Sequence, residues 1–388
     1  MKLNWQRIKP KFKISVLDRY LAGQLSVFFA FSLSLFTSLG VAVGNVADLG
    51  EKVAEYNLPY KVALLIFGYK IPEYAAYALP ISTLLTGLVV YSRLQSDREL
   101  VALFSFGISI YRLMLITVVL SLVITGITFL LNELVVPVAN YQANLLQNPF
   151  IPKTELNLQR QNIYYGEFEP RLESNSSNKL QQLYFAEQYA PPQLRGITII
   201  TFQEAGISQI ITAQTAQWNQ QQQVWDLTAG IIYHLDAEEN LTTKFTTKQL
   251  RLSPTIFQII DRQRSPEDMN IYQAEEYLEL IKDSGKPTEI SKLAVRIQQK
   301  YAFPWICIVF ALIGSALGAK YGQVNRGKSF ALCVAIVFTY YCLGFGCGAL
   351  GITGVISPFL AAWLPNAIGL VLGVCLLISG SFGSERDK

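Results

Sequence analysis

Long apolar runs dominate the two ends of the chain and are missing from its middle. Residues 25–47 carry no charge over 23 positions, and at about 1.5 Å per residue such a run can cross the hydrocarbon core of a bilayer. Comparable runs follow at roughly 62–92, 108–131, 301–319, 329–350 and 359–381. The pattern predicts six membrane-spanning helices, three on each side of a central insertion. The first run is too long for the core of a signal peptide, so we expect an uncleaved anchor.

The insertion has a β-type pattern. Across residues 160–255, short runs rich in Ile, Thr, Tyr, Phe and Val alternate with polar or Gly/Pro turns. Six or more such strands without intervening helices predict a sandwich, a jellyroll or a partly closed barrel. A connector helix should lead back to the membrane, with Ser265 as N-cap, Pro266 at its first position and Gly285 at its end.

Charge separates the insertion from the rest. Residues 141–290 hold 18 acidic and 12 basic side chains, whereas the remainder holds 10 and 20. The basic residues gather at the N-terminus and in the loops after the second and fourth runs. The positive-inside rule therefore predicts cytoplasmic termini and an insertion, at about 141–290, on the outer side of the membrane.

Composition excludes several kinds of site in the insertion. All five cysteines lie in the last three apolar runs, so a disulfide scaffold is excluded there. His234 is the only histidine of the chain, which argues against a metal centre or a catalytic triad. We expect no catalytic residues, no metal and no nucleic-acid partner.

One motif resembles a nucleotide-binding sequence. Gly322 to Ser329 spells the G-x-x-x-x-G-K-S pattern of a phosphate-binding loop. That loop requires a preceding buried strand, and here an apolar membrane run precedes it. We interpret the stretch as a basic turn facing lipid phosphates, so the chain is not expected to bind or hydrolyse ATP itself.

Charges within or beside the apolar runs are the candidate lipid-binding residues, because an unpaired charge in hydrocarbon is costly. Lys70 and Glu73 lie three residues apart on one helical face. They either pair with each other or line a cavity for an amphiphile with a charged head group. Lys52, just outside the first run, is a weaker candidate for the same role.

Residues 93–107 predict a short amphipathic cytoplasmic helix. Leu100 and Leu103 can rest on the membrane or on a partner, while Asp97, Arg98 and Glu99 point the other way. Such a segment suits a membrane subunit that receives force from a cytosolic motor, although an ordinary interfacial helix has the same pattern.

Five stretches carry a family resemblance over essentially the whole chain. They are VLDRYL, RLQSDRELVALFSFGIS, LLNELVVPVAN, VRIQQKYAFP and GVISPFLAAWLPN, in this order around the inserted β-domain. The sequence resembles the LptF/LptG (YjgP/YjgQ) permeases of the lipopolysaccharide exporter. The resemblance implies six inner-membrane helices with a periplasmic β-jellyroll between helices 3 and 4. The expected divisions are an N-terminal membrane half at 1–140, a β-jellyroll domain at 141–264, a connector helix at 265–290 and a C-terminal membrane half at 291–388.

The resemblance also implies a mechanism. Two permeases, identical or paralogous, would bind an LptB-like ATPase dimer that holds ATP and Mg²⁺, while LptC-like and LptA-like jellyrolls would accept the lipopolysaccharide. Glu99 stands where the family's acidic residue meets the ATPase, with Arg98, Asp97, Leu100 and Leu103 around it. Candidate linings of a slot for acyl chains in the jellyroll are Ile199, Phe202, Ile211 and Ile232.

One departure and two alternatives remain. Residues 20–51 contain no Lys or Arg, whereas family members often carry basic residues there, so a glycolipid other than lipopolysaccharide is possible as cargo. An ion-coupled secondary transporter would instead require an inverted repeat and buried acids, and only Glu73 lies well inside a run. A membrane-anchored enzyme or envelope scaffold lacks a catalytic constellation but stays open for partner binding.

Overall fold

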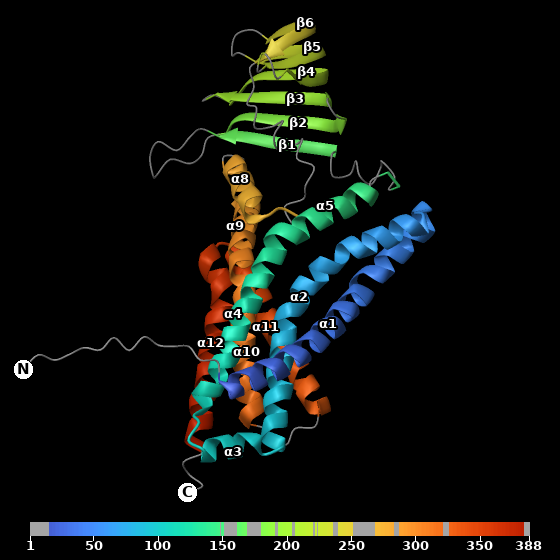
Figure 1. Cartoon of the computed structure of the whole chain (residues 1–388). Helices are drawn as coiled ribbons and strands as arrows, with labels where there is room; N and C mark the ends of the chain where they lie inside the picture. The colour runs from blue at the N-terminus through green and yellow to red at the C-terminus, as the bar shows by residue number, and fades with distance from the viewer. Residues whose placement is uncertain are drawn as a thin grey trace, which may run out of the picture.

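The protein is a bundle of long helices with a β-domain at one end (Figure 1). The structure is a computed structural model that describes residues 15–147, 149–150, 161–168, 180–190, 193–203, 206–219, 222, 224–235, 240–250, 268–282, 287–320 and 326–383. Within these residues, six helical stretches are long and apolar enough to cross a membrane: Val16–Tyr56, Tyr60–Ser96, Ile110–Gln147, Pro287–Lys320, Gly327–Ile352 and Pro358–Ser379. The six predicted spans and the all-β insertion between the third and fourth are confirmed.

The spans divide into the following elements. The N-terminal half consists of α1 (Val16–Tyr56), α2 (Tyr60–Ser96), the short α3 (Glu99–Ser105), α4 (Ile110–Leu130), a π-helical turn η1 (Leu131–Val135) and α5 (Val136–Gln147). The C-terminal half consists of α8 (Ile271–Ile281), α9 (Pro287–Ala302), a 3₁₀ turn η2 (Phe303–Trp305), α10 (Ile306–Lys320), α11 (Arg326–Ile352) and α12 (Pro358–Gly383). The third span continues to Gln147, beyond the division predicted at residue 140.

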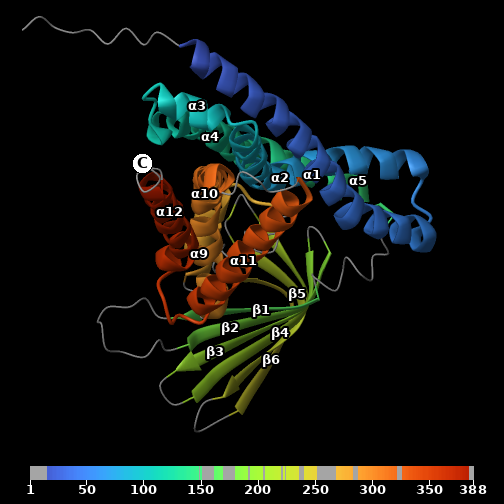
Figure 2. The same cartoon turned by 90° about the horizontal axis from the view of Figure 1, so that it is seen from below.

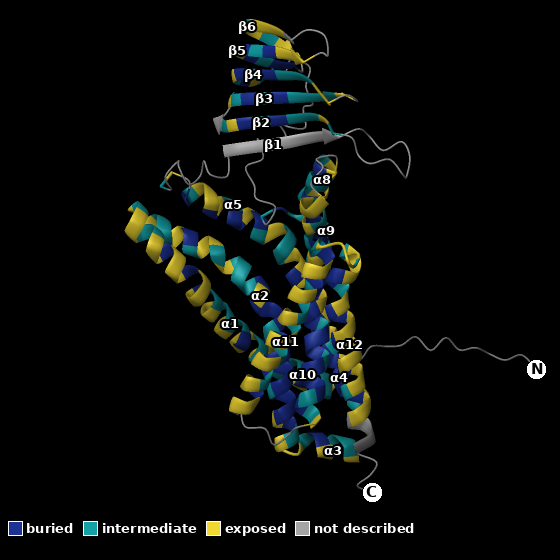
Figure 3. Ribbon diagram, turned by 180° about the vertical axis from the view of Figure 1, so that it is seen from behind, coloured by how far each residue is buried: buried dark blue, intermediate teal, exposed yellow. Residues whose placement is uncertain are grey.

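The centre of the bundle is the crossing of α2 and α10. Small residues allow the two backbones to approach closely, as is usual where membrane helices associate. A Cβ added to Gly314 would lie 2.5 Å from the carbonyl oxygen of Leu84, and one added to Gly318 would lie 2.7 Å from that of Leu88. Figure 3 shows the buried residues concentrated here, whereas α1 and α2 turn exposed faces outward at their far end.

Helices α1 and α2 form a hairpin that leans away from the other helices, with α5 beside its far end (Figures 1 and 2). At about 1.5 Å per residue, the 41 residues of α1 extend about 60 Å, twice the thickness of a hydrocarbon core. In its middle, Gly40 and Gly44 face the ring of Tyr74, and a Cβ at Gly44 would lie 2.4 Å from its hydroxyl oxygen. At its far end, Leu49 packs with Leu58, Ile66 and Ala143.

The start of the connector helix differs from the prediction, and the basic turn predicted at Gly322 to Ser329 is partly helical. The connector helix begins later than expected, at Ile271, because Asn270 caps it through a reciprocal capping box with Gln273; Ser265, Pro266 and Gly285 lie outside the described residues. The G-K-S end of the phosphate-loop pattern, Gly327 to Ser329, lies within the first turns of α11, and α10 ends at Lys320. A helix therefore precedes the pattern, as expected, and the intervening residues 321–325 are outside the described part.

The β-domain is one antiparallel sheet in the order β1-β2-β3-β4-β5-β6. Its strands are β1 (Gln161–Phe168), β2 (Leu180–Ala190), β3 (Gln193–Gln203), β4 (Gly206–Asn219), β5 (Val224–Leu235) and β6 (Asn240–Leu250). Each strand pairs with the next along the chain, so the described strands form a meander rather than two facing sheets.

A crease lets this single sheet enclose a core. In a regular strand, inward-facing residues recur every second position. In β3, β4 and β5, however, two successive buried residues are three positions apart, and the three irregular sites lie side by side across the sheet. We call the line through these sites the crease. Buried residues there run from Leu194 to Ile197 in β3, from Ala213 to Ala216 in β4, and from Leu227 to Gly230 in β5. The left-handed φ angles of Gly196 (63°) and Ala229 (51°) fall at the crease. Both sides of the crease therefore turn toward one interior.

Candidate functional site

The predicted site residues fall into three separate places. The residues around Glu99 lie at the end of the bundle away from the sheet, in and beside α3 (Figure 1). Lys52 belongs to α1, and Lys70 and Glu73 belong to α2. The four residues proposed for the acyl slot belong to strands β3, β4 and β5. We describe each place in turn.

Helix α3 is shorter than the segment predicted at 93–107, because α2 continues to Ser96. The chain turns sharply between the two helices: Asp97 caps α2, and Arg98 adopts a left-handed φ of 59° before α3 begins at Glu99. A non-glycine residue in this conformation is uncommon and is held by its surroundings. Arg93 Nε contacts Asp97 Oδ2 at 3.5 Å, while Arg98 is exposed.

Two side-chain contacts tie the start of α1 to this end of the bundle. The Tyr20 hydroxyl donates to Glu99 Oε2 at 3.0 Å. The guanidinium of Arg112, at the start of α4, reaches both carboxylate oxygens of Asp18 at 2.8 Å. Glu99 is therefore engaged within its own chain through one hydroxyl, which leaves its carboxylate able to accept further hydrogen bonds.

The apolar residues of α3 have two different roles. Leu100 is fully buried in a cluster with Leu21, Leu94 and Leu113, and Leu103 packs against the same cluster. These two residues hold α3 on the bundle instead of facing outward. The outward face carries Val101, 49% exposed, and Phe106, 83% exposed. Sequence reasoning missed Phe106, although an aromatic residue just before Gly107 at the end of a short helix was the available signal.

The charged candidates of the hairpin are paired. Lys70 Nζ lies 2.9 Å from Glu73 Oε2, with both side chains about three-quarters buried, so the first of the two predicted alternatives is the one observed. Lys52 Nζ lies 2.7 Å from Asp48 Oδ2 and 3.4 Å from Gln147 Oε1 of α5. The lipid-binding role of these residues stays a prediction.

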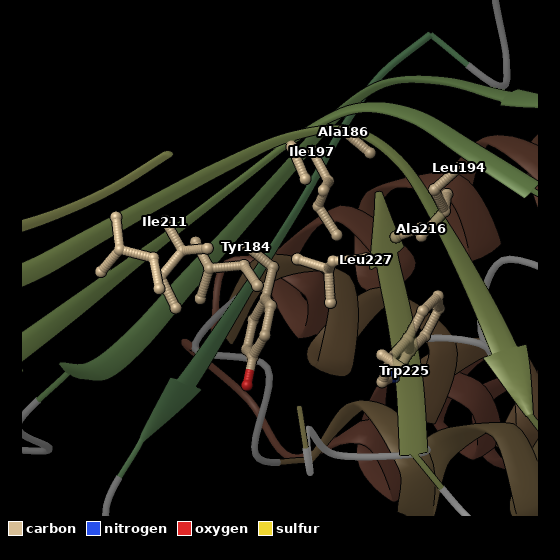
Figure 4. Close-up of a cluster of buried hydrophobic side chains, with 11 residues drawn as sticks. Tyr184, Ala186, Leu194, Ile197, Ile211, Ala216, Trp225 and Leu227 are labelled. Carbon is tan, nitrogen blue, oxygen red and sulfur yellow. The ribbon is translucent and has the colours of Figure 1, made fainter. Parts of the chain in front are cut away.

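The interior of the creased sheet is apolar (Figure 4). A row of residues crosses it from strand to strand, in which Tyr184 pairs with Ile199, Ile199 with Ile211, and Ile211 with Ile232. All four are buried, and Trp225 and Leu227 complete the core from beyond the crease. Of the predicted slot residues, Ile199, Ile211 and Ile232 thus share one face.

Phe202 does not join that buried row. The register shifts between Thr201 and Phe202, which pairs with Ile207, and Phe202 is only half-buried. A regular strand places residues three apart on opposite faces, so the spacing from Ile199 already argued against a shared face.

The three remaining quoted stretches make contacts at breaks in the helices. Asn366 of α12 donates to the carbonyl oxygen of Ala302, where α9 gives way to the turn at Pro304, and accepts from the Tyr340 hydroxyl at 2.7 Å. Glu133 of η1 accepts from the backbone N–H of Ile271 at 2.9 Å. These quoted stretches therefore supply contacts at the η1 and η2 turns, where the helices change direction.

The described residues contain no group of three or more His, Cys, Asp or Glu side chains that could hold a metal ion. The arrangement instead offers an apolar membrane bundle, a short docking-type helix at one end and an apolar β-interior at the other. This arrangement suits the handling of an amphiphile.

Comparison with known proteins gives a consistent result. A search of curated proteins found no matching relative. Among protein families, residues 19–379 match the one described as lipopolysaccharide export system permease LptF/LptG. The match covers every membrane span in large part and the entire β-domain. The chain therefore belongs to the LptF/LptG family of lipopolysaccharide export permeases.

Proposed function

We propose that this protein is the permease subunit of an ABC transporter that extracts lipopolysaccharide from the inner membrane and passes it to a periplasmic β-jellyroll bridge toward the outer membrane. The family match over residues 19–379 carries the proposal. The bundle and the β-domain support it, because an acyl-bearing lipid requires apolar surroundings both in the membrane and after it leaves the membrane.

The proposed orientation places both termini and α3 in the cytoplasm and the β-domain in the periplasm. Arg93, Arg98 and Arg112 gather at the α3 end, and Lys320 and Arg326 flank the loop between α10 and α11. Basic residues in short loops favour the cytoplasmic side. The acidic balance of the insertion is consistent with export.

The proposed motor is a separate LptB-like ATPase dimer that holds ATP and Mg²⁺. Each permease would present α3 to one ATPase subunit, with Glu99 and Arg98 as polar contacts and Phe106 and Val101 as apolar ones. Leu100 and Leu103 would transmit force because they pack into the bundle. A second permease, as a copy or a paralogue, would complete the lipid cavity.

The proposed lipid path runs from the membrane between two protomers to the interior of the β-domain. Lys52 and the Lys70–Glu73 pair would lie along the head-group side. The row from Tyr184 to Ile232 would receive acyl chains, and LptC-like and LptA-like partners would continue the path through their own sheets.

The whole proposal is tested by native mass spectrometry of the tagged protein purified gently from its own host. We expect a complex with two copies of a small ATPase and a bound multi-acyl glycolipid, and the mass also reports one permease species or two. A protein that runs without any ATPase would contradict the motor-driven mechanism and favour a secondary transporter or an envelope scaffold. A bound glycolipid of another class would leave the ABC mechanism intact and change only the cargo.

The β-interior is tested at the edge strand β6, where two adjacent threonines face opposite sides. Thr243 pairs with Ile232 and shares its inner face, whereas Thr242 pairs with Tyr233 on the outer face. Both are exposed, so a photo-crosslinking amino acid is tolerated at either. We expect labelling of glycolipid at Thr243 to exceed that at Thr242 by about fivefold or more in cells. Equal labelling would exclude this face as the acyl path.

A further inference from the structure

The chain returns from the β-domain to the membrane helices at Asp268–Ile271, and side chains from three other elements hold this short segment. Asn144 Nδ2 of α5 donates to Asp268 Oδ2 at 3.0 Å. Lys300 Nζ of α9 donates to the carbonyl oxygen of Met269. Glu133 Oε2 of η1 accepts from the backbone N–H of Ile271 at 2.9 Å. We call the contacts of Asn144, Glu133 and Lys300 with this segment the anchor.

The π-helical turn explains how Glu133 reaches the segment. Pro137 has no backbone N–H and its ring would clash with the carbonyl group four residues earlier, which is that of Glu133. The helix avoids the clash by widening, and the N–H of Val136 bonds to the carbonyl oxygen of Leu131, five residues back. The widened turn bends the span between α4 and α5 (Figure 1) and directs Glu133 toward α8. Widened turns of this kind are frequent at functional sites.

The contact between the Glu133 carboxylate and the start of α8 is electrostatically favourable, but one carboxylate oxygen has no hydrogen-bond partner among the described residues. The first N–H groups of a helix have no partner within the helix, and a carboxylate is stabilised at that end. The Lys300 ammonium is close enough to interact with both Glu133 and Asp268. However, Glu133 Oε1 is buried without a hydrogen-bond partner among the described residues. A buried acceptor without a partner costs about 1–3 kcal/mol, so a rearrangement that supplies Oε1 with a donor would stabilise a different position of this carboxylate.

We propose that the anchor transmits changes in the α4–α5 bend to the attachment of the β-domain, with Glu133 as the positioning residue that links them. The inference adds a route by which movement of the membrane helices could reach the β-domain. Its role in transport rests on the proposed function. The bend and α8 are joined at the same carboxylate, so rotation of η1 withdraws the acceptor from the first turn of α8.

The contact is tested by hydrogen–deuterium exchange of the full-length permease in detergent, followed in peptides that cover 268–282. With Glu133→Ala we expect exchange in the first turn of α8 to accelerate about tenfold, the factor that corresponds to about 1.4 kcal/mol. Glu133→Gln, which keeps an acceptor, should give a smaller acceleration and guards against misfolding. Glu279→Gln is the matched control, because Glu279 is an exposed acid of α8 whose carboxylate lies 3.4 Å from Lys282 Nζ and not at the first turn. Unchanged exchange in Glu133→Ala would overturn the proposal.

Transmission is tested by Pro137→Ala, which restores a donor for the Glu133 carbonyl and relaxes the widened turn. We expect faster exchange in 268–282 in the otherwise natural protein and no further acceleration when Glu133→Ala is already present. An acceleration of equal size in both backgrounds, or none in the first, would show that the bend does not act through Glu133.

Neither experiment requires an ATPase or a lipid. A negative result therefore counts against the anchor alone, whereas a missing ATPase in the native complex counts against the proposed function.

Discussion

Alanine in place of Gly314 should destabilise the folded bundle by about 3 kcal/mol, near the top of the usual range for overpacking a core. The new Cβ would lie 2.5 Å from the carbonyl oxygen of Leu84 and 3.3 Å from its Cα. These are backbone atoms of α2, so no side chain can move aside to relieve the contact. The two most buried helical stretches of the bundle would have to separate along their crossing.

The effect is measured as the temperature at which half of the purified permease loses its monodisperse peak in size-exclusion chromatography. Gly346→Ala is the matched control, since Gly346 lies in the membrane helix α11 with nothing within 4 Å of an added Cβ. That change should be neutral or should stabilise by about 0.5–1 kcal/mol through helix propensity. Equal stability of the two variants would mean that the backbones of α2 and α10 are farther apart at their crossing than in the structure.

If the proposed ATPase binds at Glu99, Glu99→Gln should reduce the amount that copurifies with the permease by about thirtyfold or more, because loss of one partner of a desolvated charge pair costs about 2–5 kcal/mol. Tyr20→Phe removes the same internal hydrogen bond from its other end but keeps the carboxylate. A lost hydrogen bond of about 1 kcal/mol predicts a reduction of no more than about fivefold. Association is measured by quantitative mass spectrometry after affinity purification.

The pair of variants separates two roles of Glu99. If the carboxylate contacts the ATPase, Glu99→Gln is much the more severe change. If Glu99 only fixes α3 to α1, the two variants should be equally impaired. Asp97→Asn, which removes the acid that lies 3.5 Å from Arg93, shows whether this second acid of the predicted coupling segment also contributes to association. Unimpaired association in Glu99→Gln would exclude Glu99 from the interface.

The six spans and the β-insertion could be predicted from sequence because each rests on a local pattern. Residues 25–47 are uncharged, and the strands alternate around obvious turns. The start of α8 was misplaced because two capping signals, Ser265 and Asn270, lie close together. The crease of the sheet could not be predicted from a local pattern. It requires irregular sites in three strands to lie next to one another, and one of these sites contains Ala229 in a left-handed conformation.

The candidate sites were predictable only as single residues. Sequence spacing placed Lys70 and Glu73 on one face, and the structure pairs them. Tyr20 and Glu99 are 79 positions apart, and Glu133 and Ile271 are 138 apart, so no local rule joins them. Burial of Leu100 likewise depends on α1 and α4 packing over α3.

The unbroken course of α1 has a mechanical consequence. It has no internal proline, unlike α2 with Pro72 and Pro80, and it runs without interruption from the Tyr20 contact with α3 to the Lys52 contact with α5. From Tyr20 to Lys52 the helix extends about 48 Å, so a tilt of about 5° at the α3 end displaces the other end by about 4 Å. Helix α1 can therefore serve as a lever, so that a small displacement at α3 is amplified at the opposite end of the molecule.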